Sequence, residues 1–108
     1  MTQNARLIYN PEAGALRRYG QPMLDRALDQ LRQSGIHAEL VSTTGPGTGG
    51  AIARDLVDRE GVDTILVAGG DGTINEVMNG LVHTDAAFGI LPAGTANVLA
   101  NEMRIGTW

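Results

Sequence analysis

The chain has 108 residues, a formal net charge of −4 and no cysteine, and all 8 of its basic residues are arginine. This length predicts one compact domain, and a hydrophobic content of 43% indicates a globular chain. The absence of cysteine excludes a disulfide framework and a thiolate zinc site. The absence of lysine excludes a Schiff base and a Walker A phosphate loop.

Composition also bears on partners and location. The acidic balance argues against nucleic acid as a partner, because neutralising phosphates needs clustered positive charge. No apolar run approaches the roughly 20 residues of a membrane span. The first residues, Met1 to Arg6, do not resemble a signal peptide. We therefore expect a cytoplasmic domain without a transmembrane segment.

Apolar runs and amphipathic stretches alternate along the chain. In chain order they predict strand 7–9, helix 16–31, strand 36–41, helix 52–57, strand 62–68, helix 74–81, strand 88–91 and helix 96–103. Gly35 and Gly61 are predicted to end the first two helices, because glycine accepts the left-handed conformation common at that position. The βαβαβαβα order predicts an α/β fold, a three-layer α/β/α arrangement around a mostly parallel sheet.

Loops rich in Gly, Asn or Thr follow every predicted strand. They are segments 10–14, 43–50, 69–73 and 92–95. Ligands of such sheets bind outside the carboxyl ends of the strands, so we expect these loops to line one rim. The first functional prediction is therefore a ligand site at this rim.

The segment Gly69-Gly70-Asp71-Gly72-Thr73 is the strongest local signal. Its glycines would allow close approach of a ligand and positive φ, and Thr73 with Glu76 would form a capping box at the next helix. A helix start of this kind attracts phosphate, whereas Asp71 would repel it unless Mg²⁺ bridges the two. Asp71 could instead act as a base on an acceptor hydroxyl. A plain tight turn is the structural alternative.

The segment 45–50 matches G-x-G-x-x-G, the pattern of dinucleotide sites. It follows the second strand rather than the first, and Pro46 stiffens the turn, so a flexible loop with a helix entry is favoured. Thr43 and Thr44 beside it are candidate phosphate or ribose donors. His37, His83, Met23, Met78 and most arginines are interpreted as structural: the histidines as structural or solvated, the methionines as core and the arginines as solvent-facing.

Three segments together resemble the diacylglycerol kinase catalytic domain family, which includes bacterial lipid kinases and sphingosine kinases. They are 8–11 with Gly14, 69–80 and 89–97, in family order and covering essentially the whole chain. Gly-Gly-Asp-Gly alone is shared with NAD kinases and phosphofructokinases. The Pro-Ala-Gly-Thr-Ala-Asn segment at 92–97 favours the lipid kinases.

The resemblance implies ATP-dependent phosphorylation of a lipid hydroxyl with Mg²⁺. Asp71 would be the central acidic residue, catalytic and a ligand of the Mg²⁺ that accompanies ATP. ATP contacts would fall on Asn10, Pro11, Glu12, Ala13, Gly14, Thr44, Gly70, Asp71, Gly72, Thr73, Ile74, Asn75, Glu76 and Thr95. The implied fold is like the first domain of NAD and diacylglycerol kinases.

Family catalytic cores also carry a second, mostly β domain that forms much of the lipid site. The resemblance therefore implies that residues 1–108 are a single nucleotide-binding domain, the N-terminal half of a two-domain kinase, with little turnover alone. Trp108 would lie near the domain junction, and the full-length protein could contact membranes peripherally. The alternatives are an NAD-kinase-like relative and a non-catalytic nucleotide-binding or interaction module.

Overall fold

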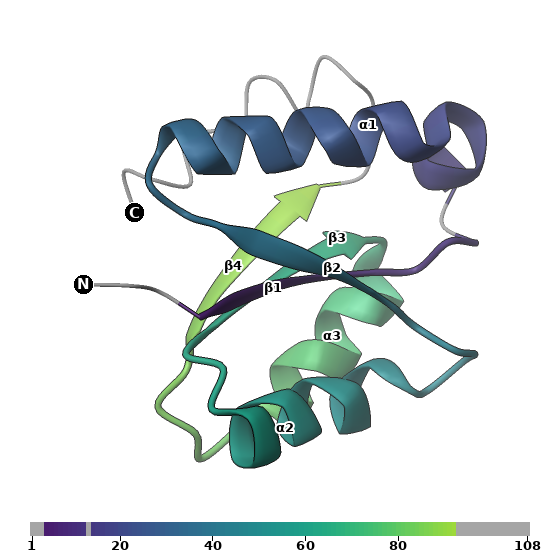
Figure 1. Ribbon diagram of the computed structural model, residues 1–108. Coiled ribbons are helices and arrows are strands. Elements are labelled where there is room, and N and C mark those ends of the chain that lie inside the picture. Colours follow the sequence, from purple (N-terminus) through teal and green to yellow (C-terminus); the bar gives the residue numbers. More distant parts are fainter. Residues whose placement is uncertain (1–3, 13, 93–108) are drawn as a thin grey trace.

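The computed structural model describes residues 4–12 and 14–92, with the backbone alone for 14–19 and 92. Strands and helices alternate throughout (Figure 1). They are β1 (Ala5–Tyr9), α1 (Gly14–Gln33), β2 (Ala38–Ser42), α2 (Gly49–Glu60), β3 (Thr64–Gly69), α3 (Asp71–Gly80) and β4 (Ala87–Pro92). The order predicted from the sequence is confirmed up to β4. The predicted helix 96–103 lies outside the described residues, as does Trp108.

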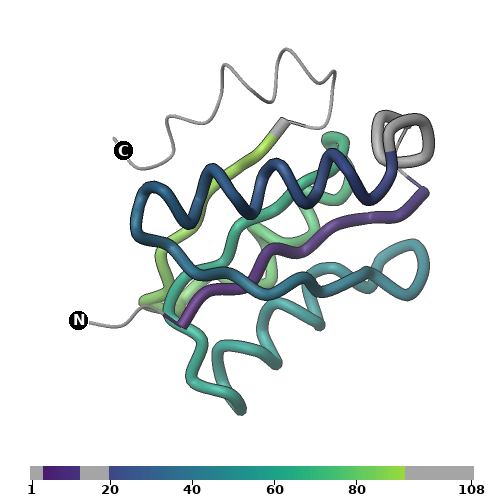
Figure 2. The backbone as a smooth tube through the Cα atoms, turned by 45° about the horizontal axis from the view of Figure 1, so that its top comes forward, coloured from purple at the N-terminus to yellow at the C-terminus, as the bar shows by residue number. Residues whose placement is uncertain are grey.

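The four strands form one parallel sheet in the order β2-β1-β3-β4. Its register sets Leu7 of β1 beside Leu40 of β2 and Leu66 of β3. Helix α1 covers one face, and α2 and α3 lie side by side on the other (Figure 1). The tilted view of Figure 2 shows the same arrangement, with α1 passing in front of β3 and β4. The predicted three-layer α/β fold is therefore confirmed.

Two hydrophobic cores flank the sheet because successive strand residues point to opposite faces. Leu7 and Leu66 pack with the buried side of α1, whereas Ile8 and Val67 pack with α2 and α3. All six residues of β3 are buried, as expected for a central parallel strand covered on both faces. The inner strands are thereby held rigidly, and they fix where their following loops begin.

Helix α1 departs from the continuous helix predicted over 16–31. Gly20 has φ 62° and ψ −146°, which is not helical, and it joins two helical segments. Pro22 lies two residues after Gly20 and fits the first turn of the second segment, where a backbone N–H would have no helical partner. Met23 and Leu31 of that segment are buried, as predicted for Met23.

The other differences are small. Gly35 and Gly61 have φ of 87° and 67° and end their helices as predicted. Met78, predicted as core, is 44% exposed on α3. His37 precedes β2 instead of lying within it, and His83 stands in the turn after α3 with φ 69°. No helix within 4–12 and 14–92 is both long and apolar enough to cross a membrane.

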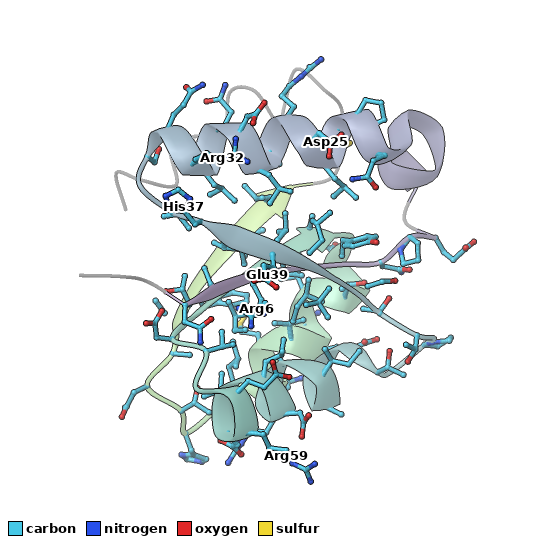
Figure 3. All side chains as sticks on the ribbon, viewed as in Figure 1. Arg6, Asp25, Arg32, His37, Glu39 and Arg59 are labelled. Atoms are coloured by element: carbon cyan, nitrogen blue, oxygen red, sulfur yellow. The ribbon has the colours of Figure 1, made fainter. Side chains whose placement is uncertain are left out.

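Four of the described arginines pair with nearby carboxylates. Figure 3 shows Arg32 on α1 and Arg59 on α2 at the outer surface of their helix layers. The ion pairs are Arg6–Glu60, Arg32–Asp29, Arg54–Asp58 and Arg59–Asp55. Three of the four arginines lie on helix surfaces, where an exposed pair contributes roughly 0.2–1 kcal/mol. These arginines thus form ion pairs on the surface of the protein.

Candidate active site

The candidate site lies where the chain leaves the two central strands in opposite directions. β1 continues into α1 on one face, and its neighbour β3 continues into α3 on the other. Open α/β sheets bind their ligands outside the carboxyl ends of the strands at such a point. The segments 10–12 and 70–72 flank it directly, and the β2 loop 43–48 lies next to β1. The segment after β4, with Thr95, lies outside the described residues.

The loop after β1 is a tight turn fixed by its first residue. Asn10 Oδ1 accepts a hydrogen bond from the Glu12 N–H at 2.9 Å, which closes an Asx turn around Pro11. Pro11 and Glu12 are exposed. Ala13 lies outside the described residues, and Gly14 opens α1. The turn lies at the carboxyl end of β1, one of the two central strands of the sheet.

The loop after β3 differs from its prediction in two respects. Helix α3 begins at Asp71, with Gly70 as its N-cap, and no side chain in the described part of the chain caps it, so the predicted capping box is wrong. Thr73 is instead the third helical residue, buried against Gly69. The predicted positive φ is also wrong for Gly69, Gly70 and Gly72, none of which has positive φ. Gly70 precedes the helix in an ordinary extended conformation, which needs no glycine.

Gly70 and Gly72 stand in open space. Among the described residues, a Cβ built on either glycine meets nothing within 4 Å, so neither glycine is required there by packing or by backbone conformation. Gly70 and Gly72 therefore place no side chain over the first turn of α3, whose N–H groups have no intrahelical partner. A helix start with uncovered N–H groups favours anions through hydrogen bonding and the helix dipole.

Asp71 is exposed in the first turn of α3, where the helix dipole favours its negative charge. The described part of the chain contains no group of three His, Cys, Asp or Glu residues arranged to hold a metal ion. A single carboxylate nevertheless fits Mg²⁺, which commonly combines one or two carboxylates with nucleotide phosphates. A metal here would therefore depend on the phosphates for its other ligands.

The loop after β2 is tied down by hydrogen bonds. The Thr43 N–H donates to the Tyr9 carbonyl at 2.9 Å, which joins the loop to the end of β1. The Thr44 N–H donates to Thr48 Oγ1 at 3.2 Å, and that hydroxyl donates to the Gly45 carbonyl at 2.7 Å. Thr44 is exposed beside the site, whereas Thr43 is buried. The favoured helix entry is confirmed, because α2 starts at Gly49.

Glu76 links this loop to α3. Its Oε2 accepts the Gly47 N–H at 3.1 Å, and its Oε1 accepts the Gly49 N–H at 3.0 Å. The side chain is half-buried. Sequence reasoning missed this role because the partners lie 29 and 27 residues away. No local pattern signals such a distant contact.

Two glycines let α2 and α3 come into backbone contact. A Cβ on Gly50 would stand 2.6 Å from the Glu76 carbonyl oxygen, and one on Gly80 would stand 2.7 Å from Gly50 Cα. Only glycine fits at either position without a shift of the backbone. The helix that begins at Asp71 is therefore fixed against the helix that follows the β2 loop.

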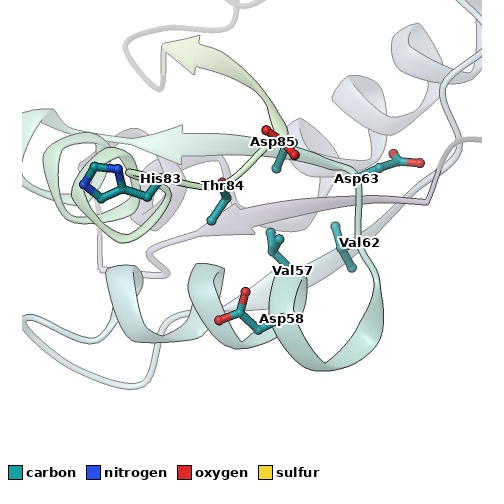
Figure 4. A pocket seen from close by; sticks show the side chains of 8 residues that line it. Val57, Asp58, Val62, Asp63, His83, Thr84 and Asp85 are labelled. Atoms are coloured by element: carbon teal, nitrogen blue, oxygen red, sulfur yellow. The ribbon is translucent and has the colours of Figure 1, made fainter.

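A cavity of about 310 Å³ opens at the opposite end of the sheet, beside the amino ends of β3 and β4 (Figure 4). It is lined by Val57, Asp58, Val62, Asp63, His83, Thr84, Asp85 and Ala86. None of these was predicted as a site residue. Asp63 is engaged locally, since its Oδ1 accepts hydrogen bonds from the Asn4 N–H and the Thr64 hydroxyl.

Comparison with known proteins identifies the family. The family model described as "Diacylglycerol kinase catalytic domain" matches residues 4–107. The chain belongs to the diacylglycerol kinase catalytic domain family. It is 39% identical over 105 residues to "Diacylglycerol kinase" of Bacillus subtilis (strain 168), covering 95% of this chain and 34% of that protein. It is 37% identical over 90 residues to "Probable lipid kinase YegS-like" of Enterobacter sp. (strain 638), covering 80% and 30%.

A solved structure agrees with this assignment. The crystal structure of a diacylglycerol kinase from Bacillus anthracis str. Sterne has a TM-score of 0.70 and 27% identity to the chain, covering 85% of this chain and 33% of that one. The chain thus spans about a third of the length of these relatives. The family resemblance and the fold predicted from the sequence are confirmed, whereas the individual contacts with ATP remain predictions.

Proposed function

We propose that residues 1–108 form the ATP-binding part of a lipid kinase that transfers the γ-phosphate of ATP to the hydroxyl of a diacylglycerol-like or sphingosine-like lipid. The observation that carries the proposal is the uncapped start of α3, with Gly70 and Gly72 in open space at the point between β1 and β3. Membership of the diacylglycerol kinase catalytic domain family supports the reaction class. The remainder of a kinase of this family would supply most of the lipid site.

In this proposal the N–H groups of the first turn of α3 bind the phosphates. The Asn10 turn and the exposed Thr44 would border the nucleotide from the β1 and β2 loops. The side chains of Thr73 and Ile74 are less available for contact with ATP than predicted, because Thr73 is buried and Ile74 is half-buried. Their contribution would come from backbone groups.

Asp71 has two chemical uses in this proposal. Its carboxylate could hold Mg²⁺ together with the phosphates, and Mg²⁺ would neutralise charge on the phosphate oxygens. It could instead accept the proton of the lipid hydroxyl. Only the first use makes ATP binding by this chain depend on both Asp71 and Mg²⁺.

Titration of the chain with ATP by NMR, with and without Mg²⁺, tests the proposal. We expect weak binding in the presence of Mg²⁺, with amide shifts centred on residues 70–73, and little binding of NAD. Absence of any ATP binding at millimolar concentrations would refute the proposed function for this chain. Preferential binding of NAD would favour a dinucleotide site.

Asp71→Asn separates the two uses of the carboxylate. If Asp71 holds Mg²⁺, the variant binds Mg·ATP about fivefold or more weakly, yet binds metal-free ATP at least as well, because a repulsive charge is removed. Asp85→Asn removes the same charge from an exposed residue at the opposite end of the sheet and is the matched control. An equal response to ATP with and without Mg²⁺ would assign Asp71 to the hydroxyl instead.

A further inference from the structure

Glu76 gives α2 the anion that its own sequence lacks. The N-cap of α2, Thr48, makes no side-chain capping bond, and the first turn contains no acidic residue. The Glu76 carboxylate reaches across from α3 and accepts N–H groups from Gly47 and Gly49 with its two oxygens. Hydrogen bonds to an ionised acceptor are stronger than neutral ones, and the α2 dipole adds to the attraction.

The fit around the carboxylate is close. A Cβ on Gly49 would lie 3.0 Å from Oε1, so the absence of a side chain at Gly49 is what admits the carboxylate. Farther along the same two helices, Gly50 and Gly80 allow backbone contact. Glu76 therefore acts within a fixed helix pair, and its carboxylate cannot leave the α2 start without exposing two N–H groups.

This arrangement has two consequences for nucleotide binding. First, α3 carries both Asp71 and Glu76, so the loop with Thr44 is held relative to the turn with Asp71. Second, the anion position of the G-x-G-x-x-G segment is already filled by a carboxylate. A nucleotide phosphate brought there would meet a negative charge instead of free N–H groups.

We propose that Glu76 is a positioning residue that holds the 44–49 segment against α3 and directs phosphate to the start of α3 by occupying the start of α2. The effect of Glu76 on nucleotide binding rests on the proposed ATP-binding function. It also predicts a property of the N–H groups of Gly47 and Gly49 that can be measured without ATP.

The experiment uses the 108-residue chain, its variants Glu76→Gln and Glu76→Ala, and Glu39→Gln as the matched control. Glu39 is exposed on β2, and its substitution changes the charge equally. NMR would follow the amides of Gly47, Gly49 and Gly72 during titration with inorganic phosphate and then with Mg·ATP. Amide hydrogen exchange of the same residues would report whether their bonds persist.

In the unmodified chain and in Glu39→Gln, phosphate should shift Gly72 and leave Gly47 and Gly49 unchanged. In Glu76→Ala, phosphate should now shift Gly47 and Gly49, a response that loss of packing alone would not produce. Glu76→Gln presents an amide donor to one of the two N–H groups. It should speed exchange there and weaken Mg·ATP binding about three- to tenfold.

The outcomes separate the two proposals. If the unmodified chain binds Mg·ATP and both Glu76 variants bind it equally well, the positioning role is wrong and the proposed function stands. If the unmodified chain fails to bind ATP, the proposed function is wrong, and the phosphate and exchange responses still decide the role of Glu76. Phosphate shifts at Gly47 and Gly49 in the unmodified chain would overturn it. Should Glu76→Ala unfold, Glu76→Gln carries the test.

Discussion

Two pairs of glycines in the α2–α3 region occupy opposite environments. Gly50 and Gly80 lie where the helices touch, and a Cβ on either would collide with backbone. Gly70 and Gly72 lie at the start of α3, where a Cβ would meet no atom of the described residues within 4 Å. The first pair is needed by the fold, whereas the second pair is not.

This difference bears on function because a glycine unused by the fold needs another reason. In an exposed helix, glycine costs roughly 0.5–1 kcal/mol relative to alanine. Gly72 lies inside the first turn of α3, so the chain accepts this cost without gaining packing or a special φ there. Close approach of a ligand to the N–H groups is a use that fits the open space.

The largest expected effect is that of Gly80→Ala. Its Cβ would fall on the backbone of Gly50, and the backbone cannot give way as a flexible side chain can. We expect the free energy of unfolding to fall by about 2–3 kcal/mol, as for other overpacked contacts. Urea denaturation measures it. A loss below about 0.5 kcal/mol would show that the helices can separate without cost.

Gly72→Ala should differ from Gly80→Ala in that it lowers affinity for Mg·ATP and not stability. Its free energy of unfolding should be unchanged or raised by up to about 1 kcal/mol, because alanine is the better helix former. Its affinity for Mg·ATP should fall about tenfold or more if the phosphates approach the backbone there. Calorimetric titration and urea denaturation of one sample give both quantities.

Gly70→Ala tests the other open glycine at the start of α3, the N-cap residue. Alanine is disfavoured at an N-cap, so a modest loss of stability accompanies its expected loss of affinity. If both variants bind Mg·ATP as the unmodified chain does, the open pair has no role in nucleotide binding. The comparison between the two glycine pairs would then concern helix packing alone.

The sequence could predict the sheet and the rim because both depend on local patterns. The apolar run at 62–68 signals a doubly buried strand, and loops after parallel strands must share one edge. The break at Gly20 had a local signal in Pro22, which a continuous helix could not have accommodated unchanged. The apolar spacing continues across the break and predicts a single helix.

The remaining features of the site depend on distant contacts. The spacing of Thr73 and Glu76 fits a capping box, yet the Glu76 carboxylate instead accepts N–H groups 27 and 29 residues away. The contact between Gly50 and Gly80 likewise joins two helices that no short pattern relates. Met78 lies on a part of α3 that the packing leaves exposed, and only the folded arrangement fixes which part that is.

The smallest expected effect concerns Gly49, which lies between the two extremes. Its Cβ would stand 3.0 Å from Glu76 Oε1, the end of a side chain that can move at the cost of its hydrogen bonds. Gly49→Ala should therefore lower the free energy of unfolding by about 1 kcal/mol in the unmodified chain and by less in the Glu76→Ala background. A double-mutant cycle should give a coupling of about 0.5–1 kcal/mol.

Gly80→Ala is the control, since its neighbour is backbone and its cost should be the same in both backgrounds. Additivity of the Gly49 and Glu76 substitutions would mean that the carboxylate does not hold the start of α2.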